Sequence, residues 1–109
     1  MMKDDFVIVE HILESINKIE KYVDGLSVND FVDNELVQDA VIRNFEIIGE
    51  ATKNLSNDFR ERYPNIPWKQ MAGMRDILIH DYLGIDIYSV WGTIEKNIPS
   101  LKQQLLDVK

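Results

Sequence analysis

The sequence predicts an all-α protein, an antiparallel four-helix bundle with short extra helices, and three observations lead to this prediction. Apolar residues recur at steps of three and four along nearly the whole chain, which is the period of an amphipathic helix. The strict apolar–polar alternation typical of half-buried strands is absent. The stretches between the apolar repeats are short, and short connections favour antiparallel helical neighbours.

Length and composition support one domain over residues 1–109. The chain has 109 residues, of which 45% are hydrophobic and 28% charged, as in ordinary globular domains. So short a chain buries a limited core, which favours support from a second copy, and we expect a homodimer. The absence of cysteine excludes a disulfide framework, a thiolate metal site and a cysteine nucleophile.

The first helix is predicted from residue 6 to residue 23, and Gly25 ends it. Its apolar stripe consists of Phe6, Val9, Ile12, Leu13, Ile16, Ile19 and Val23. A short turn over residues 26–32 follows, with Ser27 and Asn29 as capping candidates.

The second main helix is predicted over residues 33–55. Its stripe consists of Leu36, Val37, Ala40, Val41, Phe45, Ile48, Ala51 and Leu55. Residues 56–58 then offer an N-cap for a short segment over residues 59–63. Pro64 and Pro67 exclude a continuous helix through the connection that follows.

A third main helix is predicted from Trp68 to Leu83, where Gly84 ends it. Asp86 is the expected N-cap of the last helix, in which Pro99 introduces a kink. The apolar side of this last helix consists of Ile87, Val90, Trp91, Ile94, Ile98, Leu101 and Leu105.

Charge and hydropathy limit where the protein works and what it binds. The N-terminus is acidic and lacks the regions of a signal peptide, and no apolar run approaches a bilayer span. We therefore expect a cytoplasmic protein that does not enter a membrane. The net charge of −7 argues against broad electrostatic binding of nucleic acid, so an RNA substrate would need a local basic site. The same acidity suits a basic protein partner or simple solubility.

The most informative stretch runs from Arg75 to Tyr82. It places an arginine, a histidine and a tyrosine at spacings of five and then two within an apolar segment. On an ideal helix Arg75 and Tyr82 lie within about 20° of each other, and Arg75 and His80 lie about 140° apart. Asp76 and His80 share a face because they are four residues apart.

The same helix is apolar on two sides. Met71, Met74, Ile77 and Leu78 form its core face, whereas Ile79 and Leu83 fall between the polar groups on the opposite side. A helix that is apolar all round is usually buried all round. A second subunit would cover the second side, and the polar residues of both chains could then face one cleft.

These residue types suit RNA cleavage without a metal or a cofactor. Histidine titrates near neutrality and serves as acid or base. Arginine stays protonated and forks onto phosphate oxygens. Asp76 could orient His80 or Arg75, and Tyr82 could donate to phosphate. A structural alternative stays open: a histidine near a helix C-terminus is favourable for stability alone, and Arg75 could pair with a neighbouring carboxylate.

Other candidates carry weaker signals. Arg43 and Glu50 share a face of the second main helix and either support the cleft or form exposed ion pairs. The tryptophans, Trp68 and Trp91, are interpreted as core or interface anchors. A basic rim for RNA or an ordinary solvated surface would account equally for Lys53, Arg60, Arg62 and Lys69. His11 is interpreted as a bystander, and no metal-site spacing is recognised among Asp4, Asp5, Glu10 and Glu14.

Three segments together resemble the HepT-like branch of the HEPN superfamily. They are residues 43–51 (RNFEIIGEA), residues 63–68 (YPNIPW) and residues 71–82 (MAGMRDILIHDY), and the likeness is strongest from Arg43 to Trp91. The Arg-x4-His-x-Tyr motif in its Gly-Met-Arg-Asp context is the specific element of this resemblance.

The resemblance implies a dimeric HEPN bundle that acts as a toxin, in a type VII-like toxin–antitoxin system. It implies metal-independent endoribonuclease activity with Arg75 and His80 as the catalytic pair and Asp76 and Tyr82 in support. It also implies a nucleotidyltransferase antitoxin of the MntA type, which inactivates the toxin by adenylylation of Tyr82. The alternative is a non-catalytic helical dimer that binds such a nucleotidyltransferase or a nucleotide.

Overall fold

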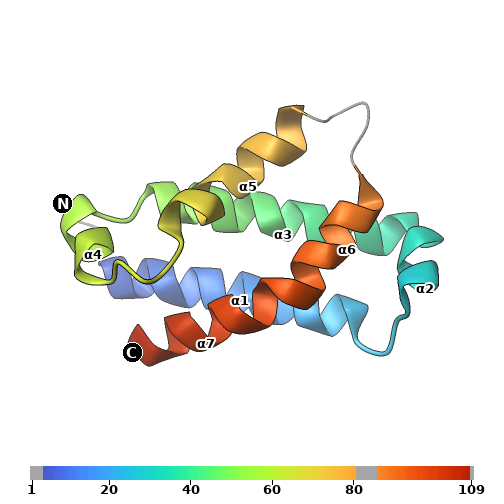
Figure 1. The fold of residues 1–109 in the computed structure, drawn as a ribbon, viewed down its shortest axis with the longest axis horizontal. Coiled ribbons are helices and arrows are strands. Elements are labelled where there is room, and N and C mark those ends of the chain that lie inside the picture. The colour runs from blue at the N-terminus through green and yellow to red at the C-terminus, as the bar shows by residue number, and fades with distance from the viewer. Residues whose placement is uncertain (1–3, 81–85, 109) are drawn as a thin grey trace.

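The computed structural model shows a bundle whose main helices alternate in direction along the chain (Figure 1). It describes residues 4–80 and 86–108, and for residues 75–80 it describes the backbone alone. Over these ranges it contains α-helices and no strand, so the predicted all-α fold is confirmed. The helices are α1 (Asp5–Val23), α2 (Val28–Val32), α3 (Glu35–Lys53), α4 (Asn57–Arg62), α5 (Trp68–His80), α6 (Ile87–Lys96) and α7 (Ile98–Val108).

The antiparallel pair α1 and α3 forms the centre of the bundle (Figure 1). The stripe predicted for α1 is confirmed at its middle positions, because Val9, Ile12, Ile16 and Ile19 are all 0% exposed. Asp4 is the N-cap of this helix, and its carboxylate accepts a hydrogen bond from the Phe6 backbone N–H. It ends before Gly25, where a φ of 77° places the backbone in the left-handed region that glycine adopts without strain.

The two short helices are held by their capping residues. The predicted turn after α1 contains a short helix, α2. A capping box between Ser27 and Asp30 caps the N-terminus of this helix. Ser56 caps α4, as residues 56–58 predicted. The Asp5 carboxylate at the start of α1 accepts from the Ser56 backbone N–H at 2.9 Å and from its hydroxyl at 2.8 Å. This contact ties the start of α4 to the start of α1.

The predicted last helix is divided into two at Asn97. The break lies two residues before Pro99, which has no backbone N–H to continue the helical hydrogen-bond ladder. The predicted apolar side is confirmed on both pieces, since Val90, Ile94, Ile98, Leu101 and Leu105 are buried. An ion pair of 2.7 Å between Lys102 and Glu20 also joins α7 to α1.

Asp86 is the N-cap of α6, as predicted, and accepts from the backbone N–H groups of Tyr88 and Ser89. Hydrogen bonds from the Ser89 hydroxyl, and next from the Ser89 backbone N–H, hold the pKa of the Asp86 carboxyl below its ordinary value of 3.8. A carboxyl whose pKa is lowered on folding stabilises the fold above its unfolded pKa. That contribution is therefore present at neutral pH and is lost as the pH falls through the lowered pKa.

Two residues predicted on apolar stripes are exposed instead. Leu36 is 80% exposed, although its neighbour Val37 packs against the core. Phe6 is 42% exposed and touches Phe59 edge-on with ring centroids 5.5 Å apart. Both residues lie in the first turn of their helix, where the neighbouring helices cover only part of the surface. Periodicity therefore identified the apolar face of each helix but not where along the helix its burial begins.

Candidate functional site

Arg75, Asp76 and His80 all lie on α5, which confirms the predicted helix as far as His80. Their side chains are outside what the structure describes. His80 is five positions after Arg75, which corresponds to about 7.5 Å along a helix axis. Tyr82, with Leu83 and Gly84, lies outside the described residues. The roles assigned to these side chains therefore remain predictions.

The start of α5 is anchored by Trp68. Its indole N–H donates to the backbone carbonyls of Arg60 at 3.1 Å and Tyr63 at 3.0 Å. The ring is 7% exposed and packs against Phe59. These contacts confirm Trp68 as a core anchor that fixes where the helix carrying the motif begins. They also leave too little of its ring exposed for stacking on a base.

The position of α5 relative to the bundle is set by α3. The two helices pack along much of their described length, and Met71 on α5 is 0% exposed. This confirms the core face predicted for α5 at Met71, and Met74 is half-buried against the core. In Figure 1 the carboxyl-terminal end of α5, which carries the motif, rises at the margin of the molecule away from α1 and α7.

Arg43 does not contribute a buried charge near the motif. Its side chain is 70% exposed and lies 3.5 Å from the Glu46 carboxylate in an i, i+3 pair. This confirms the interpretation of Arg43 as part of an exposed ion pair with another residue. Trp91 is half-buried and packs against Phe31 at the edge of the core with ring centroids 5.2 Å apart, as expected of a core or interface anchor.

Three of the four cations considered as a basic rim border shallow hollows in the described part of the chain. Arg60 and Lys69 border the same shallow hollow between α4 and α5, together with Glu61. Arg62 borders a different hollow, which also contains Asp107. The structure thus brings Arg60 and Lys69 together at one hollow and places Arg62 at another, and each of the two hollows also includes a carboxylate.

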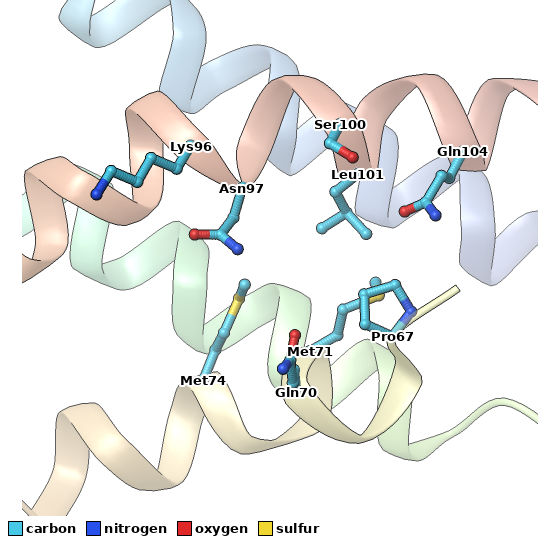
Figure 2. A pocket seen from close by; sticks show the side chains of 9 residues that line it. All are labelled: Pro67, Gln70, Met71, Met74, Lys96, Asn97, Ser100, Leu101 and Gln104. Carbon is cyan, nitrogen blue, oxygen red and sulfur yellow. The ribbon is translucent and has the colours of Figure 1, made fainter. Parts of the chain in front are cut away.

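A hollow of about 100 Å³ lies between α5 and the junction of α6 with α7 (Figure 2). Gln70, Met71 and Met74 rise from α5, and Asn97, Ser100, Leu101 and Gln104 face them from the junction and α7. This hollow was not predicted from the sequence. Asn97, Ser100 and Gln104 do follow one another at steps of three and four in the sequence, but Lys102, Gln103 and Asp107 are also polar, so this spacing did not stand out.

The acidic residues of the first helix have structural roles where the structure defines them. Asp4 caps α1, and Asp5 holds Ser56. Among the described residues no group of three histidine, aspartate or glutamate side chains could hold a metal ion. His11 is exposed on α1. Over the same residues, no helix combines the length and apolar character needed to cross a membrane.

Comparison with known proteins relates this chain to ribonucleases of the HepT-like family. Residues 12–108 match the ribonuclease HepT-like family. A protein of Methanocaldococcus jannaschii named "Gamma-glutamylcyclotransferase and putative RNase" is 50% identical over 108 residues, which cover 99% of this chain and 49% of that protein. The chain therefore spans about half the length of that relative.

Two further relatives match over most of their own length. A "Putative RNase" of Caldanaerobacter subterraneus subsp. tengcongensis is 44% identical over 107 residues, covering 98% of this chain and 96% of that protein. A "Probable ribonuclease HepT" of Thermococcus cleftensis is 49% identical over 94 residues, covering 86% of each chain. No solved structure matches the chain significantly.

Proposed function

This chain belongs to the HepT-like ribonuclease family of the HEPN superfamily, and from that premise we propose that it is a metal-independent endoribonuclease. The observation that carries the proposal is the match over residues 12–108 together with the intact Arg75-x4-His80-x-Tyr82 motif inside it. Arg75 and His80 lie on one helix anchored by Trp68 but about 140° apart around it, so their acting together requires the cleft that a second chain would complete.

The proposed reaction uses the nucleophile that RNA already contains. A base removes the proton from the 2′-hydroxyl, and the 2′-oxygen bonds to the adjacent phosphorus. The bond from phosphorus to the 5′-oxygen breaks, and that oxygen takes up a proton. The products are a 2′,3′-cyclic phosphate and a 5′-hydroxyl, and no water is consumed in this step.

The residues of the motif divide this work according to their chemistry. His80 transfers the proton, because imidazole is the side chain that titrates near neutral pH. Arg75 stabilises the charge that develops on the phosphate oxygens, because guanidinium is always protonated and donates in a fork. Asp76 lies four residues before His80 and supports the orientation of its ring.

The activity is proposed to serve a toxin of a type VII-like toxin–antitoxin system, with an MntA-like nucleotidyltransferase as antitoxin. In the proposed control step the Tyr82 hydroxyl attacks the α-phosphorus of ATP, forms a phosphodiester with AMP and releases pyrophosphate. The family match and the tyrosine two residues after His80 support this role. Expression of the chain alone should arrest growth, and coexpression with an MntA-like nucleotidyltransferase that adenylylates it should restore growth. Equal growth in both cultures would contradict the toxin role.

We expect the active form to be a homodimer with α5 near its two-fold axis. The reason is the two-sided apolar pattern of residues 71–83, of which a single bundle covers one side. Light scattering at micromolar concentration should give twice the mass of one chain. A monomer mass at that concentration would contradict this arrangement.

A further inference from the structure

The hollow between α5 and the α6–α7 junction differs in charge from the others described. None of its lining residues is acidic, although the chain contains 19 aspartates and glutamates against 12 lysines and arginines. The hollow beside Arg60 includes Glu61, and the hollow beside Arg62 includes Asp107. Because carboxylates repel phosphate, the hollow between α5 and the α6–α7 junction is the one of the three best suited to contact a polyanion.

Polar groups at this hollow have unused hydrogen-bonding capacity. Within the described ranges, the side chains of Gln70, Asn97 and Ser100 make no hydrogen bond to the protein. The Gln104 amide nitrogen donates to the Asn65 carbonyl at 3.1 Å, and its oxygen remains available as an acceptor. A side-chain amide offers both donors and an acceptor in one plane. These are the groups that pair with the edge of an unstacked base.

The floor of the hollow is apolar. Met74 is half-buried and offers apolar surface to a ligand, beside Met71 and Leu101, which are 0% and 3% exposed (Figure 2). Thioether sulfur makes favourable contacts with aromatic rings. The volume of about 100 Å³ is well below the roughly 300–1,000 Å³ of sites that enclose a whole drug-sized ligand. A group about the size of one base is therefore a better match to the hollow than a whole nucleotide.

The hollow is also adjacent to the proposed catalytic pair along α5. Met74 directly precedes Arg75, and Met71 lies four residues before it, or about 6 Å along the helix axis. We propose that this hollow binds one nucleobase of the RNA substrate, from a nucleotide beside the phosphate contacted by Arg75. Gln70 and Asn97 would read its edge and so set a sequence preference at one position. This inference rests on the proposed ribonuclease function.

Methionine methyl spectroscopy tests the inference directly. The four methionines are Met1, Met2, Met71 and Met74, so a ¹³C-methyl-labelled protein gives two signals at the hollow and two at the N-terminus. The His80→Ala protein, in which RNA stays intact, is titrated with a short single-stranded RNA of mixed sequence. Its Met71 and Met74 signals should shift through the ring current of the bound base. RNA binding by fluorescence anisotropy without a shift of either signal would overturn the inference and leave the ribonuclease proposal standing.

Cleavage by variants gives the second test. In wild-type protein, replacing one nucleotide next to the cleavage site by an abasic one should lower kcat/KM by about tenfold or more, as expected for loss of base-edge hydrogen bonds. In Gln70→Ala and Asn97→Ala this discrimination should largely disappear. Gln103→Ala is the matched control, because Gln103 is exposed on α7 and donates to Asp107. If both Gln70→Ala and Asn97→Ala still discriminate against the abasic substrate as the wild type does, the inference is overturned. A protein that neither binds nor cleaves RNA would overturn the ribonuclease proposal as well.

Discussion

Replacing His80 with alanine is expected to abolish RNA cleavage. The chain has only two histidines, and the other, His11, is exposed on α1. Without His80 no imidazole on α5 can accept the 2′-hydroxyl proton or return a proton to the leaving 5′-oxygen. Initial rates on a defined RNA, with protein folding checked by circular dichroism, measure the effect. His11→Ala is the matched control and should cleave at the wild-type rate.

Arg75→Ala should also lower the rate of RNA cleavage by a large factor. Loss of one donor that stabilises transition-state charge typically lowers a rate by about 10²–10³-fold. Arg43→Ala is the control for removal of an arginine, since its guanidinium pairs with Glu46 on the surface of α3. A folded His80→Ala protein that cleaves at the wild-type rate would show that the assigned mechanism is wrong. Equal losses in Arg43→Ala and Arg75→Ala would remove the case for a specific role of Arg75.

Replacing Tyr82 with phenylalanine is expected to prevent adenylylation completely. The substitution keeps the ring and removes the oxygen that would bond to the α-phosphorus of ATP. On an ideal helix Tyr82 lies within about 20° of Arg75, so AMP attached there would place an anion beside the guanidinium. The modification would then occupy the phosphate-binding charge and obstruct RNA without any change of conformation.

Intact-mass spectrometry after incubation with the nucleotidyltransferase, ATP and magnesium measures this result. The wild-type chain should gain whole AMP increments, and Tyr82→Phe should gain none. Tyr88→Phe is the matched control, because Tyr88 is 62% exposed on α6 and should leave the modification unchanged. AMP on Tyr88, or AMP retained by Tyr82→Phe, would contradict the assignment of Tyr82.

The sequence was sufficient to predict the helices because each carries a strong local signal. The stripe of α1 and the glycine after it specified a helix that the structure confirms from Asp5 to Val23. Ser56 and Asp86 were predicted as N-caps because short polar side chains before an apolar repeat satisfy free backbone N–H groups. These signals involve residues close together in the chain, and a single sequence contains them.

Features that depend on neighbouring helices were harder to predict. Leu36 continues the period of α3, yet it is 80% exposed because burial requires a second element over that side. Pro99 predicted a kink in the last helix, but whether the helix bends or breaks depends on how α6 and α7 pack, and it breaks at Asn97. Periodicity shows which face of a helix is apolar, but not how much of that face the neighbouring helices bury.

The candidate site divides in the same way. The motif residues stand close together in the sequence, so their placement on one helix could be predicted and is confirmed for Arg75, Asp76 and His80. The hollow joins Gln70 and Met74 to Asn97 and Ser100, which are more than twenty residues away in the chain. No local pattern reports such a meeting, because it arises from the packing of α5 against the α6–α7 junction.

The chemistry of the cleaved ends tests the central claim most directly. A defined oligoribonucleotide is incubated with the purified protein in EDTA, and the products are analysed by mass spectrometry beside a substrate with one 2′-deoxy nucleotide at the cleavage site. If Arg75 and His80 promote attack by the 2′-hydroxyl, the products should be a 2′,3′-cyclic phosphate and a 5′-hydroxyl, and the 2′-deoxy substrate should not be cut at that site. Products with 5′-phosphate ends, or equal cleavage of the 2′-deoxy substrate, would contradict the account.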